Sequence, residues 1–190
     1  MGYDMTSSSA GHSRSLVRST VVFYGLLLLA AGLWDRYSQS VDLRWFSGDW
    51  VLDLQAIGVG AGFSALVVVG GIKARRFEFA RKLEVIFQEA LGRPGHGEIA
   101  LLALASSVSE EIFFRGALQQ SLGLWVTVII FAALHGFFHP RYLVWSIFAG
   151  VAGLVWGILA GWSGGLVGTT VSHCLINWIN LELLCHHWRE

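Results

Sequence analysis

Charged side chains are scarce in this sequence. Only 14% of the 190 residues are Asp, Glu, Lys or Arg, whereas 54% are hydrophobic, and the mean hydropathy is +0.58. These values lie outside the usual range of a soluble domain. The formal net charge is zero, so no overall basic surface favours nucleic acid and no acidic arm is indicated. The composition predicts a membrane protein.

Cysteine is also rare. Cys174 and Cys185 fall on one predicted helix, separated by about 16 Å along its axis. That distance is too long for a disulfide between them. Cysteine usage therefore gives no indication of the redox compartment.

Apolar stretches are abundant instead, and a helix needs about 20 such residues to cross a bilayer. Lipid requires that the backbone polar groups be satisfied within the segment, which predicts helices. We therefore predict an all-α, polytopic membrane helix bundle with about six transmembrane helices and an interfacial amphipathic helix. The predicted spans are residues 19–34, 54–72, 99–119, 122–138, 142–162 and 166–184.

The linker of residues 73–97 sets the predicted orientation. It carries six Lys or Arg against three Glu, and the positive-inside rule places it in the cytoplasm. With six spans, both termini are then cytoplasmic, and we expect a bacterial plasma membrane. Apolar residues recur in the linker at helical spacing, which predicts a helix on the cytoplasmic leaflet.

The chain divides into four predicted parts. Residues 1–18 form a disordered N-terminal tail, and residues 19–72 hold two transmembrane helices. The basic amphipathic linker, 73–97, separates these from a core of four transmembrane helices in residues 98–185. The fifth span carries small residues at every fourth position, a pattern that lets two helices approach closely: Ala149, Gly153, Gly157, Gly161 and Gly165.

The third span contains two adjacent acids and an arginine, which are costly in lipid and therefore usually face the protein interior. Glu111 and Arg115 are four residues apart, so they share one helical face and predict an internal ion pair. Glu110 lies about 100° round the helix from Glu111. The ion pair therefore does not explain Glu110.

Two other spans present polar pairs at the same spacing, Phe131 with His135 and His173 with Asn177. A single histidine in a membrane is often a hydrogen-bonded packing residue, and Phe131 is predicted as core. Helical rise places Glu110 and His173 at similar depths, about 16 Å from the cytoplasmic ends of their spans. By the same measure His135 lies one to two turns shallower, an offset that helix tilt or a shifted span boundary could absorb.

Taken together, these three motifs resemble those of a known protein family. Glu-Glu-x-x-x-Arg at Glu110, Glu111 and Arg115, Phe-x-x-x-His ending at His135, and His-x-x-x-Asn from His173 are similar, in this order, to the motifs of the CAAX protease and bacteriocin-processing family (CPBP, or Abi). The likeness covers about residues 99–184. It implies an intramembrane endopeptidase that acts on membrane-tethered or lipid-anchored protein tails, with residues 98–185 as its catalytic core.

Peptide hydrolysis needs a water, a base and donors for the oxyanion. We assign Glu110 as the base, with His135 sharing the water, and Glu111 as the partner of Arg115. His173 and Asn177 are expected to stabilise the oxyanion. The same residues Glu110, His135, His173 and Asn177 are also a plausible zinc set. No H-E-x-x-H is present, and the family includes both metal-dependent and glutamate-type descriptions, so both mechanisms stay open.

Two other functions use similar residues. A proton-coupled transporter also carries intramembrane Glu and His, and a non-catalytic immunity or partner protein keeps the same fold but acts by binding. The expected partners of the protease are its protein substrate and the lipid bilayer, with no nucleic acid. His96, His186 and His187 lie in loops or at helix ends and receive no catalytic role. Glu182, near the cytoplasmic end of the last span, is expected to snorkel to the surface.

Overall fold

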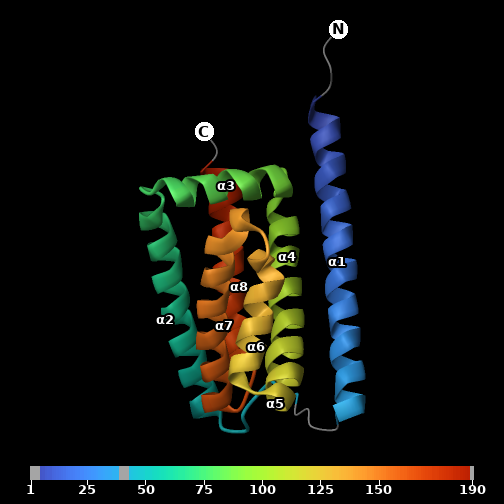
Figure 1. Cartoon of the computed structure of the whole chain (residues 1–190), viewed down its shortest axis with the longest axis vertical. Coiled ribbons are helices and arrows are strands. Elements are labelled where there is room, and N and C mark those ends of the chain that lie inside the picture. The colour runs from blue at the N-terminus through green and yellow to red at the C-terminus, as the bar shows by residue number, and fades with distance from the viewer. Residues whose placement is uncertain (1–4, 39–42, 189–190) are drawn as a thin grey trace.

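The computed structural model describes residues 5–38 and 43–188, and within these ranges the chain is helical and contains no strand (Figure 1). The helices are α1 (Met5–Ser38), α2 (Trp50–Ala74), α3 (Glu78–Leu91), α4 (His96–Glu110), α5 (Gln119–Leu122), α6 (Leu124–Ala132), α7 (Leu143–Ser163) and α8 (Val167–Glu182). Three described π-helical segments, Glu111–Leu118, Ala133–Phe137 and Leu183–His187, continue α4, α6 and α8, and a 3-10 turn, Pro140–Tyr142, precedes α7.

Each of the six predicted stretches falls mainly on helix. Three described helices are long and apolar enough to cross a membrane, namely Val17–Ser38, Trp50–Ala74 and Pro140–Ser163. Leu124–Phe137 is apolar but shorter, and the helices that carry Glu110 and His173 contain more polar residues. The prediction of an all-helical chain is therefore confirmed for the described residues. The number of six transmembrane helices stays a prediction.

α1 begins well before the predicted first span. Residues 5–18, which the sequence assigned to a disordered tail, are helical here, whereas residues 1–4 of that tail lie outside the described residues. No proline interrupts this stretch, and Ala, Leu and Arg within it favour helix. The backbone hydrogen-bond ladder of the apolar part therefore continues toward the N-terminus.

Glycine allows α2 and α8 to pack closely. A Cβ atom added at Gly60 would lie 2.6 Å from the carbonyl oxygen of Gly168, and one at Gly168 would lie 2.8 Å from the backbone of Ala56. Ser64 donates a hydrogen bond to the carbonyl of Gly60 at 2.8 Å, and its hydroxyl also lies 3.0 Å from the carbonyl of Ser172. The contact between these helices is thus made by backbone and small polar groups, as is typical of helices in lipid.

The small-residue row on α7 faces the π-helical segment that follows α4. Arg115 donates from Nη2 to the carbonyl of Gly153 at 3.1 Å, and Gln119 donates from Nε2 to the carbonyl of Gly157 at 2.8 Å. Two polar side chains four residues apart therefore meet two glycine carbonyls four residues apart. The buried apolar core surrounds this contact and consists of Phe114, Leu118, Phe131, Ala149, Ala152, Trp156 and Ile176.

α3 crosses one end of the bundle, and the start of α1 and the end of the helix that continues α8 lie at that same end (Figure 1). Phe87 packs edge-on against Trp145 of α7, with ring centroids 5.1 Å apart. Gln88 donates to the carbonyl of Leu184 at 3.0 Å, and Glu84 accepts from Arg75 at 3.0 Å. The predicted amphipathic linker therefore contains a helix that is attached to both α7 and the end of α8.

Candidate active site

The two acidic residues lie where α4 passes from α-helical to π-helical geometry. Glu110 is the last residue of α4 and Glu111 the first residue of the π-helical segment Glu111–Leu118. Both side chains are buried. A π-helical segment widens the turn and is frequent at functional sites, and here it sets the spacing between Glu111 and Arg115.

Glu111 pairs with two cationic or donor groups at once. Its Oε1 lies 3.2 Å from Nη1 of Arg115 and accepts a hydrogen bond from Nδ1 of His173 at 2.9 Å. The Arg115 side chain is also buried, with its guanidinium 4.6 Å from the ring centroid of Phe131. The predicted ion pair is therefore present in the structure, and it also fixes the orientation of His173, which sequence reasoning did not anticipate.

Glu110 faces a different set of groups. Its Oε1 accepts a hydrogen bond from the hydroxyl of Tyr24 on α1 at 3.0 Å. Its Oε2 lies 3.9 Å from Nε2 of His173 and has no hydrogen-bond partner among the described residues. The gap is too long for a direct hydrogen bond but is the kind of distance that a bridging water spans.

His173 is held rigidly in this position. Its ring stacks on Trp156 with centroids 4.1 Å apart and an angle of 19° between the planes. Trp156 in turn donates from Nε1 to the hydroxyl of Ser172 at 3.0 Å. Because Nδ1 is committed to Glu111, Nε2 is the nitrogen that His173 directs toward Glu110.

His135 reaches the same cavity through a break in its helix. The backbone departs from helical geometry at His135 and at Gly136, where φ is 98°, a conformation that favours glycine. Nδ1 of His135 donates to the carbonyl of Phe131 at 2.6 Å, which leaves Nε2 as the exposed ring nitrogen. The kink changes the position of His135 relative to a regular helix, and His135 lines the same cavity as Glu110 and His173.

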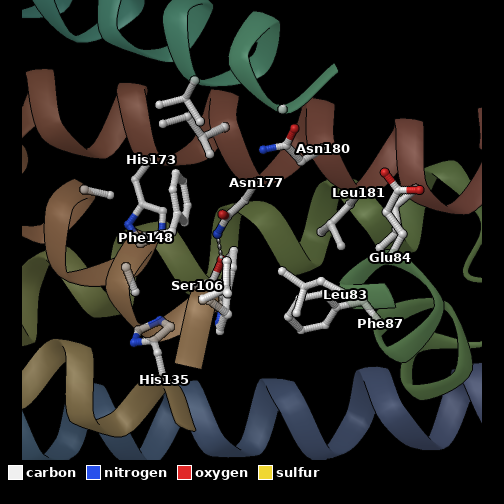
Figure 2. Close-up of a pocket in the computed structure, with 18 of the residues that line it drawn as sticks. Leu83, Glu84, Phe87, Ser106, His135, Phe148, His173, Asn177, Asn180 and Leu181 are labelled. Carbon is white, nitrogen blue, oxygen red and sulfur yellow. Dashed lines mark hydrogen bonds between the residues drawn. The ribbon is translucent and has the colours of Figure 1, made fainter. Parts of the chain in front are cut away.

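Asn177 lies one helical turn from His173. Its amide donates to the hydroxyl of Ser106 on α4 at 2.9 Å (Figure 2). A side-chain amide has two N–H donors, so one donor is used by Ser106. Asn177 is thus positioned by α4 while it lines the same cavity as His173.

These side chains line one cavity of about 740 Å³. His135 and His173 point into it from opposite sides, and Leu83 and Phe87 of α3 line another part of its wall (Figure 2). Tyr24 of α1 also contributes to the lining. The cavity therefore includes Glu110, His135, His173 and Asn177, together with α1 and α3, which lie outside the sequence resemblance.

The predicted zinc set is only partly assembled. Glu110 Oε2 and His173 Nε2 face each other, but among the described residues Glu110, His135 and His173 do not form a group whose ligand atoms all lie within 4.8 Å of one another. Asn177 donates from Nδ2 to Ser106. The side chains as placed do not fit a single metal ion held by all four residues, because their polar atoms do not converge on one point.

Sequence reasoning missed three groups that complete the site. Tyr24, Trp156 and Gly153 contact Glu110, His173 and Arg115 respectively. Gly153 had a signal, because it belongs to the small-residue row on α7 that indicated a close helix contact. Tyr24 and Trp156 had none, since an aromatic residue in an apolar helix is most often simply core or lipid-facing.

Comparison with known proteins supports the sequence motifs. Residues 96–179 match the family model described as type II CAAX prenyl endopeptidase Rce1-like, which confirms the resemblance to the CPBP family for this part of the chain. The chain is also 25% identical over 129 residues to the uncharacterized protein YpbD of Bacillus subtilis (strain 168), covering 67% of this chain and 68% of that protein. No solved structure matches the chain significantly.

The matched region contains every residue that the motifs single out. It runs from the start of α4 to within α8, and so includes the two acids, Arg115, both cavity histidines and Asn177. Together with the three apolar helices, the match indicates an integral membrane protein that is similar, over residues 96–179, to type II CAAX prenyl endopeptidases. It does not favour the transporter or the binding-only alternative.

Proposed function

From the premise that residues 96–179 match the Rce1-like endopeptidase family, we propose that this chain hydrolyses a peptide bond within the membrane, in a membrane-tethered or lipid-anchored protein tail. Residues 98–185 form its catalytic core within a bundle of about six transmembrane helices. Glu110, His135, His173 and Asn177 carry the reaction, and Glu111 and Arg115 position them.

The observation that carries the proposal is the gap between Glu110 and His173. Oε2 of Glu110 is buried and has no hydrogen-bond partner among the described residues, and it lies 3.9 Å from Nε2 of His173. Leaving such a group unsatisfied costs about 1–3 kcal/mol. A water between the two atoms would hydrogen-bond to both, and it would also be placed against a carboxylate able to take its proton.

The reaction follows from these positions. Glu110 takes a proton from the water, whose oxygen attacks the carbonyl carbon of the peptide bond, so that the carbonyl oxygen becomes an oxyanion. Nε2 of His173, which lies between the carboxylates of Glu111 and Glu110, donates a hydrogen bond to this oxyanion, and the second amide hydrogen of Asn177 adds a further bond. When the carbon–nitrogen bond breaks, Glu110 returns the proton to the leaving amine.

The remaining site residues act on these groups. Glu111 keeps His173 in the required orientation through its bond to Nδ1, and Arg115 pairs with the same carboxylate oxygen. His135 directs Nε2 toward the cavity, because Nδ1 is bound to the Phe131 carbonyl, and it shares the water with Glu110. The two acids thus have different roles although they are adjacent in sequence.

The cavity also supports the proposed substrate class. Most of its lining is apolar and comes from α2, α3, α7 and α8, so it accepts a chain segment that is extended in a hydrophobic environment. Glu110 lies on its wall. A tail held at the membrane by its own lipid or helix would reach the water between Glu110 and His173 from this cavity.

The test compares membrane proteins from cells that express the parental chain or Glu110→Gln, with new protein ends identified by mass spectrometry. We expect ends that appear with the parental chain and disappear with Glu110→Gln, because the amide cannot accept a proton. Glu89→Gln, an exposed glutamate of α3 outside the cavity, is the matched control and keeps these ends. If no end depends on Glu110, the proposed protease function is wrong.

A further inference from the structure

A second cluster of ionisable residues lies outside the candidate active site. His96 is the first residue of α4, Glu182 the last residue of α8, and His186 belongs to the π-helical segment that continues α8. These elements meet at the end of the bundle that α3 crosses (Figure 1). The cluster therefore joins the start of the helix with the two acids to the end of the helix with His173.

The three side chains converge on one point. Nδ1 of His96 lies 2.8 and 3.0 Å from the two carboxylate oxygens of Glu182, and Nε2 of His186 lies 3.9 Å from Oε2 of Glu182. The two imidazole rings are 4.4 Å apart between centroids. One ligand atom from each of the three residues lies within 4.8 Å of the other two. Among the described residues, this is the one group of three or more His, Cys, Asp or Glu side chains with that geometry.

A hydrogen-bonded ion pair explains only part of this geometry. His96 and Glu182 account for one such pair. His186 follows the C-terminal end of α8, where a histidine is favourable by itself. Two imidazoles directed at the same carboxylate would repel each other if both carried a proton. A single divalent cation would attract all three groups, and Glu182 and His186 are spaced by four residues, which puts them on one helical face.

The types of ligand atom limit which cation could bind at this site. Two imidazoles and one carboxylate suit zinc and similar transition metals, whereas calcium and magnesium prefer oxygen ligands. The His96 side chain is 77% exposed, and those of His186 and Glu182 are 29% and 21% exposed. Water can therefore supply a fourth ligand from the solvent side.

We propose that His96, Glu182 and His186 form a divalent transition-metal site, of the zinc type, that joins the start of α4 to the end of α8. The metal would have a structural role, because none of its three ligands lines the cavity that contains Glu110 and His173. By tying these two helix ends together it would hold α4 and α8 in register. This proposal does not depend on the peptidase function.

The test is a zinc titration of the full chain, purified in detergent with an affinity tag that contains no histidine. His173→Ala is introduced first, so that zinc bound by the candidate active site does not contribute. We expect saturable binding of one zinc per chain, and loss of this binding with His96→Ala, His186→Ala or Glu182→Gln. His187→Ala is the matched control in the same turn and retains it.

Two further measurements make the result decisive. Zinc is expected to raise the melting temperature of the parental chain but not that of the Glu182→Gln variant, and magnesium is expected to raise neither. Cobalt bound in place of zinc should show the visible spectrum of nitrogen and oxygen coordination. No saturable binding, or binding that survives His96→Ala and His186→Ala, would overturn the proposal in favour of a metal-free His–Glu pair.

Discussion

At the scale of single residues, the buried charges act as one unit. Glu111 contacts both Arg115 and His173, and Arg115 in turn contacts the carbonyl of Gly153. Each charge is tolerated in an apolar interior because its partners are already in place. Glu110 differs in its partners, because it accepts from Tyr24 on α1 and lies 3.9 Å from Nε2 of His173, and it is not paired with Arg115 in the way that Glu111 is.

Replacing Glu111 alone should destabilise the protein more than replacing Glu111 and Arg115 together. Glu111→Gln leaves the guanidinium of Arg115 buried without its counter-charge, and we expect a loss of about 3–5 kcal/mol in the free energy of unfolding. Glu111→Gln combined with Arg115→Met removes both charges and should recover a large part of this loss. Unfolding in mixed micelles measures both. A double variant as unstable as the single one would contradict the ion-pair explanation.

Tyr24 offers a test of the hydrogen bond to Glu110 from outside the sequence motifs. Tyr24→Phe removes the hydroxyl and keeps the ring, so the carboxylate loses a donor at 3.0 Å. A hydrogen bond to a charged group is worth about 1.5–3 kcal/mol, and we expect cleavage to slow roughly tenfold or more. The control is Tyr37→Phe, at an exposed tyrosine of the same helix. Equal rates for both variants would exclude a role of Tyr24.

At the scale of helices, glycine determines which helices approach closely. Gly60 lies against Gly168 at the crossing of α2 and α8, whereas Gly62, half a turn further along α2, has no atom within 4 Å of an added Cβ. The two positions have the same residue type but different surroundings. They therefore separate the effect of packing from that of helix propensity.

Gly60→Ala should destabilise the chain by about 1–3 kcal/mol, because the added methyl group overlaps the backbone of α8. Gly62→Ala should leave stability unchanged or raise it by up to about 1 kcal/mol through helix propensity. Thermal denaturation in detergent, followed by circular dichroism, compares the two variants. Similar melting temperatures would show that α2 and α8 do not pack as described.

At the scale of the whole molecule, the arrangement of the helices predicts which end of the bundle faces the cytoplasm. α3, the start of α1 and the end of the helix that continues α8 lie at one end of the bundle, and residues 43–49, before α2, lie at the other (Figure 1). The basic linker indicates that the α3 end faces the cytoplasm. The exposed loop residue Phe46 should then face the opposite side of the membrane.

Single cysteines test this orientation in a background with Cys174→Ser and Cys185→Ser. We expect a membrane-impermeant thiol reagent to label Phe46→Cys in intact cells, and Lys82→Cys, on an exposed residue of α3, only after the membrane is opened. The reverse pattern would invert the orientation. Labelling of both in intact cells would show that the two ends do not face opposite sides.

Much of the site was predictable because its motifs are local. Helical periodicity alone places Glu111 beside Arg115 and His173 beside Asn177. It does not predict the π-helical segments, nor the kink at His135 and Gly136. Helical periodicity therefore did not show how His135 comes to line the same cavity as His173.

The sequence by itself determined that the chain is helical and apolar, and which polar residues stand out from that background. Only the tertiary structure decided their partners: Tyr24 with Glu110, Glu111 with His173, and His96 with Glu182. The physical reason is that helix formation depends on residues a few positions apart, which the sequence displays. Contacts between helices depend on crossing points set by small residues and packing, which it does not.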